Sequence, residues 1–123
     1  MTYSALLDKL SRENILFSVS IELTHHCNLD CYYCYNDRCL RGMPLSRAQY
    51  LRIFEDLRAM EVMNLTLTGG EPLTHPDFLL LGREARSLGF VLRVKSNGHA
   101  LRGEMARWIR DEVDPFIIDI SLH

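Results

Sequence analysis

The sequence predicts an α/β protein in which four parallel strands alternate with three helices in the order βαβαβαβ. Three observations support this prediction: short segments that alternate apolar and polar residues, longer helix-like segments between them, and Gly- or Pro-containing turns that separate the two. Such alternation is typical of a parallel sheet with right-handed crossover connections. Ligands of these sheets gather at the C-terminal ends of the strands, so binding residues are expected in the loops there.

The first part of the chain contains one expected strand, a long loop and one expected helix. Residues 17–23 alternate apolar and polar side chains in a β-rich segment, which predicts the first strand. Ser46 and Gln49 have the spacing of a capping box, the reciprocal hydrogen-bonding pattern found at helix N-termini. A helix is therefore expected over residues 47–60, and a long loop connects it to the strand.

The rest of the chain repeats the strand and helix alternation with shorter turns. Glycines stand where the next helix and two of the strands are expected to end. The expected elements are a strand at 63–68, a turn at 69–72, a helix at 76–88, a strand at 91–95, a turn at 96–98, a helix at 100–111 and a strand at 116–122. Each helix thus connects two strands, as crossover connections do.

Each expected strand has one apolar face and one polar face. Strands covered on both faces of a parallel sheet are usually apolar throughout, so helices are expected on the apolar face only. A curved, partly open barrel whose polar face lines water or a ligand fits this pattern better than a flat doubly wound sheet, and an ordinary exposed face is the alternative. The polar face would carry Ser18, Ser20, Glu22, Asn64, Thr66, Thr68, Arg93, Lys95, Asp119 and Ser121.

Composition limits the classes of partner. The chain has 123 residues, 47% of them hydrophobic, which is enough for one domain with a single core. Fourteen basic and sixteen acidic side chains give a net charge of −2 without a basic stripe, so neither nucleic acid nor a membrane is expected as a partner. Residues 1–14 lack the apolar region of a signal peptide and no segment is long enough to span a bilayer, so a cytoplasmic location is expected.

Three of the four cysteines lie close together in the long loop. Cys27, Cys31 and Cys34 have the spacing C-x3-C-x2-C, and thiolates are soft ligands that suit iron–sulfur clusters, zinc or copper(I). Three thiolates on a cube-shaped [4Fe–4S] cluster leave one iron open to another ligand, which indicates chemistry rather than electron storage alone. Cys39 lies outside this spacing and is interpreted as a loop thiol, because a fourth ligand would close the site.

A structural zinc module is the alternative from a different functional class. In it, Cys27, Cys31, Cys34 and either Cys39 or a neighbouring histidine would hold the ion tetrahedrally. Structural zinc sites usually combine two ligand pairs from separate places in the chain, and a zinc site gives no reason for the Gly-Gly-Glu-Pro turn at residues 69–72. The sequence therefore favours an iron–sulfur cluster.

The cysteine spacing after the first strand and Gly69-Gly70-Glu71-Pro72 after the second together resemble the radical S-adenosylmethionine (SAM) superfamily, over essentially the whole chain. The resemblance implies a partial (β/α)6 barrel, of which residues 1–123 would be the N-terminal portion, truncated after the fourth strand, with the cluster loop at residues 24–43. It also implies an enzyme with a [4Fe–4S] cluster and SAM. Reduction by an external electron donor would cleave SAM, and the resulting 5′-deoxyadenosyl radical would abstract a hydrogen atom from the substrate.

The same resemblance assigns roles to individual residues. Cys27, Cys31 and Cys34 would ligate the cluster, and Tyr33 would lie close to the adenine of SAM. The remaining SAM contacts would come from Gly69, Gly70, Glu71, Pro72, Asn97 and Ser121, with the turn at 69–72 meeting the ammonium group. Three plainer interpretations stay open: Tyr33 shields the cluster, the Gly-Gly pair is an ordinary turn, and Asn97 stabilises its own turn.

The segment from Glu22 to Tyr33 resembles members of the superfamily that modify peptides or build peptide-derived cofactors, and members that act in molybdenum-cofactor and haem biosynthesis share it. The expected partner is therefore a peptide or another small-molecule substrate. The resemblance names no catalytic residue of the protein itself, because the substrate-contacting strands would lie outside this part of a barrel.

Overall fold

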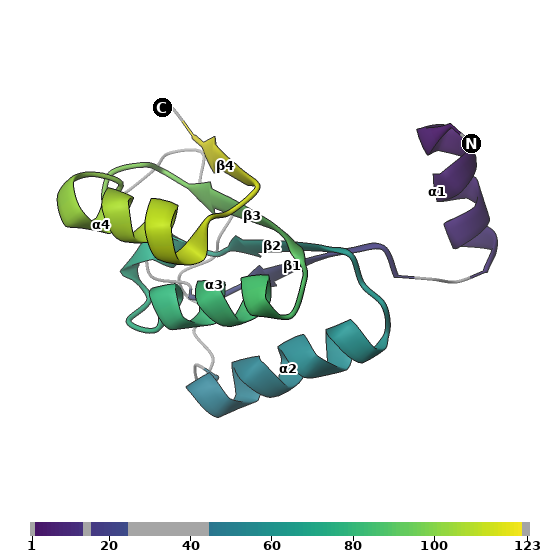
Figure 1. The fold of residues 1–123 in the computed structure, drawn as a ribbon, viewed down its shortest axis with the longest axis horizontal. Coiled ribbons are helices and arrows are strands. Elements are labelled where there is room, and N and C mark those ends of the chain that lie inside the picture. The colour runs from purple at the N-terminus through teal and green to yellow at the C-terminus, as the bar shows by residue number, and fades with distance from the viewer. Residues whose placement is uncertain (1, 14–15, 25–44, 122–123) are drawn as a thin grey trace.

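The computed structural model describes residues 2–13, 16–24 and 45–121 of the chain. Its four parallel strands form one sheet with the order β1-β2-β3-β4 (Figure 1). The strands are β1 (Ser18–Glu22), β2 (Asn64–Thr68), β3 (Val91–Ser96) and β4 (Ile117–Ile120). Register pairs such as Ile21 with Leu67 and Leu67 with Val94 align the apolar residues of neighbouring strands on one face. The expected α/β class and parallel sheet are confirmed.

The connecting helices all pack against one face of the sheet. α2 (Arg47–Ala59) precedes β2, α3 (Phe78–Ser87) precedes β3, and α4 (Gly103–Trp108) continues into η2 (Ile109–Val113) before β4. Figure 1 shows these helices on the same side of the strands. A single helix layer is the arrangement expected for part of a barrel, whereas a doubly wound sheet has helices on both faces.

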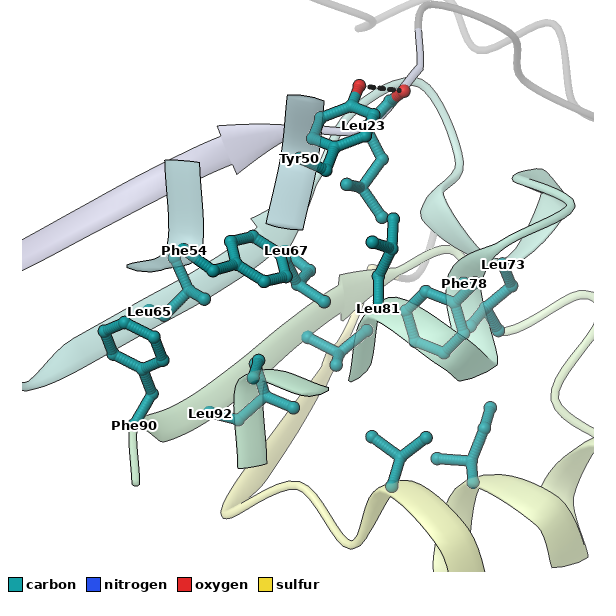
Figure 2. Packing of buried hydrophobic residues seen from close by; sticks show 14 of the residues in the cluster. Leu23, Tyr50, Phe54, Leu65, Leu67, Leu73, Phe78, Leu81, Phe90 and Leu92 are labelled. Atoms are coloured by element: carbon teal, nitrogen blue, oxygen red, sulfur yellow. Dashed lines mark hydrogen bonds between the residues drawn. The ribbon is translucent and has the colours of Figure 1, made fainter. Parts of the chain in front are cut away.

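The apolar faces of the strands and helices form one hydrophobic core (Figure 2). Leu65 and Leu67 of β2 and Leu92 and Val94 of β3 are fully buried. These residues belong to the apolar half of the alternation, so the sequence pattern identifies the face that the helices cover. From the helices, the core contains Tyr50, Phe54, Phe78, Leu81, Ala85, Ile109 and Val113.

The predicted capping box begins α2. Ser46 Oγ accepts a hydrogen bond from the Gln49 N–H at 3.2 Å, and Gln49 Oε1 accepts one from the Ser46 N–H at 2.8 Å. Tyr50 and Phe54, four residues apart, lie on the buried face of this helix. The cap therefore fixes where the helix starts and which side chains it directs to the core.

The last two helices start later than the sequence predicts. Residues 72–74 form a short 3-10 helix after the β2 turn, and α3 begins only at Phe78. The helix expected from residue 100 begins at Gly103, because a turn with a hydrogen bond from the Leu101 N–H to the Gly98 carbonyl precedes it. Its final turn widens into a π-helix, in which the Asp114 N–H donates to the Ile109 carbonyl at 2.7 Å.

One helix was not expected from the sequence. α1 (Tyr3–Arg12) precedes β1, and the side chain of Thr2 caps it by accepting a hydrogen bond from the Ala5 N–H at 3.1 Å. In Figure 1 it stands apart from the sheet and the other helices. In the part of the chain that the structure describes, no helix is both long and apolar enough to cross a membrane.

The polar face of the sheet is less open than the alternation predicts. Ser20 of β1 and Arg93 and Lys95 of β3 are exposed, but Thr66 and Thr68 of β2 are only 7% and 8% exposed. β2 lies between β1 and β3, and each threonine has one longer side chain beside it, since Thr66 pairs with Arg93 of β3 and Thr68 with Glu22 of β1. Burial on this face therefore follows side-chain length and strand position as well as polarity.

Candidate functional site

The predicted site residues fall partly within the described part of the chain. Gly69, Gly70, Glu71, Pro72, Asn97 and Ser121 are described. Outside the described residues lie Cys27, Cys31, Cys34 and Tyr33, whose roles in binding the cluster and the adenine therefore stay predictions. Cys39, interpreted from the sequence as a loop thiol, lies outside them as well. Within residues 2–13, 16–24 and 45–121, no three His, Cys, Asp or Glu side chains are grouped as metal ligands.

The ends of the four strands meet at one edge of the sheet, as expected for parallel strands. The Leu23 N–H at the end of β1 donates to the Thr68 carbonyl of β2 at 2.9 Å. The Ser121 N–H after β4 donates to the Ser96 carbonyl of β3, also at 2.9 Å. The chain enters residues 25–44, which contain all four cysteines, directly after Thr24 at this edge. The Gly-Gly turn and the Asn97 turn end the two central strands at the same edge.

Gly69 allows the turn after β2 to lie against the end of β1. Its φ is +142°, and a Cβ atom at this position would lie 2.5 Å from the Thr24 carbonyl oxygen, so no other residue fits without backbone movement. The Gly70 N–H donates to the same oxygen at 2.6 Å. The turn therefore lies directly against the end of β1, with Gly69 buried and Gly70 partly exposed.

The Glu71 side chain is completely buried. Its Oε2 accepts hydrogen bonds from Ser96 Oγ at 2.8 Å and from the Leu73 N–H at 3.2 Å, and its Oε1 accepts one from the Asn97 N–H at 2.8 Å. Sequence reasoning did not identify Ser96 as a partner, because 25 residues separate it from Glu71. The carboxylate thus connects the turn after β2 with the turn after β3.

Pro72 and Thr74 fix the chain as it leaves the Gly-Gly turn. Pro72 is buried at the first position of the short 3-10 helix η1 (Pro72–Thr74), where a missing N–H removes no helical hydrogen bond. The Thr74 hydroxyl and N–H both donate to the Glu71 carbonyl, at 2.7 and 3.1 Å. The buried Pro72 ring and the hydrogen bonds from Thr74 therefore fix the backbone that follows Glu71.

Asn97 and Ser121 lie at the same edge of the sheet. Asn97 Oδ1 accepts a hydrogen bond from the His99 N–H at 2.9 Å, which is the local turn interaction that the sequence left open. Asn97 is partly exposed and Ser121 is exposed. Their proposed contacts with SAM are compatible with this placement, since both follow the last residues of a strand.

Tyr50 and His75 support the edge from the core side. The Tyr50 hydroxyl donates to the Leu23 carbonyl at 2.8 Å, shown as the dashed line in Figure 2, and burial raises the pKa of Tyr50. The His75 ring packs edge-on against Tyr50 with ring centroids 5.7 Å apart. Burial lowers the pKa of His75, and the charge of Asp77 partly opposes this effect. No local sequence signal indicates either role, because the partners come from separate elements.

One ion pair lies on the polar face of the sheet. Arg93 Nε and Asp119 Oδ2 are 3.6 Å apart, and both side chains are about half exposed. Exposed pairs of this kind contribute little to stability, so this ion pair adds little to the free energy of folding.

Comparisons with known proteins support the same family as the motifs. The model of the radical SAM superfamily matches residues 21–123. The PqqA peptide cyclase of Ruegeria pomeroyi is 38% identical over 82 residues, which cover 65% of this chain and 22% of that protein.

Solved structures of Streptococcus suis SuiB have a similar fold. The match to SuiB bound to its precursor peptide SuiA has a TM-score of 0.74 at 20% identity and covers 98% of this chain. The match to SuiB bound to SAM has a TM-score of 0.69 at 20% identity. This likeness confirms the α/β fold expected for part of a barrel. The chain spans 22–28% of the length of these relatives.

The Gly69-Gly70 turn lies at the edge of the sheet where the chain continues from Thr24 into residues 25–44. Because the family model spans the chain from Ile21 in β1 to His123, the protein belongs to the radical SAM superfamily of enzymes, which use a [4Fe–4S] cluster and SAM.

Proposed function

We propose that this chain holds the [4Fe–4S] cluster and SAM of an enzyme that acts on a peptide substrate. When bound, this pair supplies a 5′-deoxyadenosyl radical, which abstracts a hydrogen atom from the substrate. The observation that supports the proposal is the convergence at one edge of the sheet of the Gly69-Gly70 turn, the Asn97 turn and Thr24, after which the cysteine segment begins. The protein contributes ligands, orientation and exclusion of water.

Cys27, Cys31 and Cys34 are the proposed cluster ligands. Their spacing places three thiolates on one short segment, which suits three corners of one cluster and leaves the fourth iron for the amino and carboxylate groups of SAM. Cys39 is proposed to be a free thiol, because a fourth thiolate would occupy the iron that SAM needs.

The strand ends are the proposed binding site for SAM. The carbonyl oxygens of Gly69 and Gly70 would accept hydrogen bonds from its ammonium group, and Glu71 and Pro72 hold the shape of this turn. Tyr33 would lie against the adenine, while Asn97 and Ser121 would supply further polar contacts from the ends of β3 and β4.

A peptide substrate is proposed because both kinds of relative point to one. The 38% identical relative is named as a peptide cyclase, and the SuiB structure contains a precursor peptide. The polar sheet face, with Arg93 and Asp119, is the surface on which such a substrate would meet this part of the enzyme. An external electron donor and a cytoplasmic location are part of the proposal, because reduction starts the reaction and the cysteines need to stay reduced.

Electron paramagnetic resonance of the reconstituted protein tests the proposal. The chain is purified without oxygen, loaded with iron and sulfide, reduced with dithionite and measured with and without SAM. We expect a [4Fe–4S]+ signal that changes when SAM is added, because SAM would bind the open iron. A cluster signal that ignores SAM would contradict the SAM site, and bound zinc without a cluster would support the zinc module instead.

A further inference from the structure

We propose that Glu71 is a positioning residue that ties the Gly69-Gly70 turn to the Asn97 turn from the helix-covered side of the sheet. SAM would then meet the backbone of these turns, while the Glu71 carboxylate fixes that backbone without touching the ammonium group. The inference rests on the proposed SAM site and assigns a different task to the one acidic side chain of the Gly-Gly-Glu-Pro turn.

The hydrogen bonds of Glu71 place its carboxylate on the core side of the sheet. Ser96, which donates to Oε2, shares a strand face with Leu92 and Val94, and all three are buried in the alternating pattern of β3. Arg93 and Lys95 lie on the opposite, polar face. A carboxylate bound to Ser96 and completely buried is therefore directed toward the helices and away from the polar face.

Glu71 completes a series of hydrogen bonds along the edge of the sheet. The Gly70 N–H donates to the Thr24 carbonyl and joins the turn to the end of β1. Glu71 joins the same turn to Ser96 and Asn97 at the end of β3. The Ser96 carbonyl in turn accepts a hydrogen bond from the Ser121 N–H after β4. Through Glu71, the ends of all four strands are connected on either side of the proposed ligand.

The chemistry of the three donors requires a carboxylate of this length. The Leu73 N–H, the Ser96 hydroxyl and the Asn97 N–H all donate, and a carboxylate offers acceptors on both of its oxygens. In a Glu71→Gln variant the amide NH2 would face either the Leu73 N–H or the Asn97 N–H, whichever way the amide is turned. In Glu71→Asp the side chain would be one methylene too short to reach both strands.

Amide hydrogen exchange, measured on the full chain without cluster or SAM, tests whether Glu71 connects the two turns. In Glu71→Gln we expect the amide of either Leu73 or Asn97, whichever faces the new NH2 group, to exchange about tenfold faster, since a buried hydrogen bond of this kind contributes about 1.5 kcal/mol. Glu84→Gln, an exposed glutamate of α3, is the matched control and should leave both amides unchanged. Unchanged exchange at Leu73 and Asn97 in Glu71→Gln would overturn the proposal.

A double-mutant cycle separates positioning from direct contact. In the reconstituted protein, Ser96→Ala removes a partner of Glu71 but keeps the carboxylate, and we expect it to raise the Kd of SAM as Glu71→Gln does. The double variant should raise the Kd by less than the product of the two single effects, because both variants act on the same connection, although Ser96→Ala keeps the Leu73 and Asn97 hydrogen bonds. If the effects of the two substitutions on the Kd simply multiplied, Glu71 would act on SAM independently of Ser96 and the proposal would be wrong.

The two experiments keep this inference separate from the proposed function. If the unchanged chain bound no SAM, the proposed function would fail, while hydrogen exchange would still show whether Glu71 ties the two turns. If the chain bound SAM and the amides exchanged at equal rates in all variants, only the positioning role would fail.

Discussion

At the scale of single residues, Tyr50 shows how one buried side chain supports the start of the cysteine segment. Its hydroxyl donates to the carbonyl of Leu23, a residue that is itself almost completely buried. Tyr50→Phe keeps the ring but leaves that carbonyl without its donor, so we expect the free energy of unfolding to fall by about 1–3 kcal/mol. Urea denaturation measures the change. Tyr3→Phe, at an exposed position, is the control, and equal losses in both variants would contradict the role of Tyr50.

His75 gives the protein a predicted pH dependence. Burial lowers its pKa in the folded state, and its Nδ1 accepts a hydrogen bond from the Asp77 N–H, which only an unprotonated Nδ1 can do. The unfolded chain takes up this proton at about pH 6.5, before the folded chain does. Stability from His75 is therefore present above that pH and is lost as the pH falls.

The pH prediction is tested by unfolding the protein in urea between about pH 7.5 and about pH 5.5. In His75→Gln the loss of stability on acidification should be smaller than in the unchanged protein. His99→Gln, at an exposed position, should keep the original pH dependence. Identical pH profiles for all three proteins would show that His75 does not titrate differently in the folded state.

The proposed cluster ligands predict different effects of replacing Cys31 and Cys39. Cys31 belongs to the three-ligand spacing and Cys39 does not. We expect Cys31→Ala to lose the [4Fe–4S] signal after reconstitution, whereas Cys39→Ala should keep both the signal and its response to SAM. Absorption and paramagnetic resonance spectra together measure the outcome. Equal loss in both variants would mean that the ligand set is wrongly assigned.

The sequence indicated which residues lie at the sheet edge, but it did not indicate their hydrogen-bond partners. Gly69 was recognised from its turn, and the structure adds the reason, which is its close approach to Thr24. Glu71 was expected among the SAM contacts, but its bonds to Ser96 and Asn97 join segments 25 and 26 residues apart. A sequence pattern indicates local conformation, whereas hydrogen bonds between distant segments form only once the strands lie side by side.

At the scale of elements, the turn after β2 depends on two separate properties of Gly69. A positive φ strains any other residue, and a Cβ would also collide with the Thr24 carbonyl. Gly89 has a positive φ of +92° but open space around it, so Gly89→Ala carries the strain without the collision. We therefore expect Gly69→Ala to lower stability more than Gly89→Ala, by at least about 1 kcal/mol, and to weaken SAM binding.

Urea denaturation of both glycine variants and dialysis with labelled SAM measure these effects. Gly89→Ala is the control for SAM binding, because Gly89 lies at the opposite end of β3 from Asn97. Equal stability losses would show that the contact with Thr24 relaxes without cost, and unchanged SAM binding in Gly69→Ala would remove this turn from the proposed site.

Elements were predictable where local chemistry decides them. The spacing of Ser46 and Gln49 predicts the start of α2, and the structure contains both hydrogen bonds of the capping box. α4 was expected too early, because the turn at Gly98 delays it, and its end as a π-helix brings Ile109 and Val113 to the core. α1 was not predicted from the sequence, although the side chain of Thr2 caps it.

At the scale of the whole molecule, the alternation of apolar and polar residues in the strands predicted most of the architecture. One apolar face per strand implies one helix layer, and the structure has a single core between that layer and the sheet. The same pattern overestimated the openness of the polar face at Thr66 and Thr68, because exposure depends on what the neighbouring strands carry. Polarity along a strand thus predicts which face a residue occupies, but it does not predict how much water reaches it.

A single core has a consequence for how the molecule unfolds. Phe54 of α2 and Ile109 beside Trp108 belong to the same buried cluster, although they come from helices at opposite ends of the described sheet. Trp108 is the one tryptophan of the chain, so its fluorescence reports on α4, while far-UV circular dichroism reports on all helices. If the core is one cooperative unit, both signals should change at the same urea concentration.

Phe54→Ala tests this cooperativity from the far side of the core. Removing a completely buried phenylalanine should lower the free energy of unfolding by about 3–5 kcal/mol, and it should shift the Trp108 transition as far as the circular dichroism transition. Met60→Ala, at an exposed position just after the same helix, should shift neither. If the Trp108 transition stayed in place while circular dichroism shifted, α4 would unfold independently of α2. The sheet edge would then be supported by two separate units, and loss of α2 packing would leave the Asn97 end of the proposed site intact.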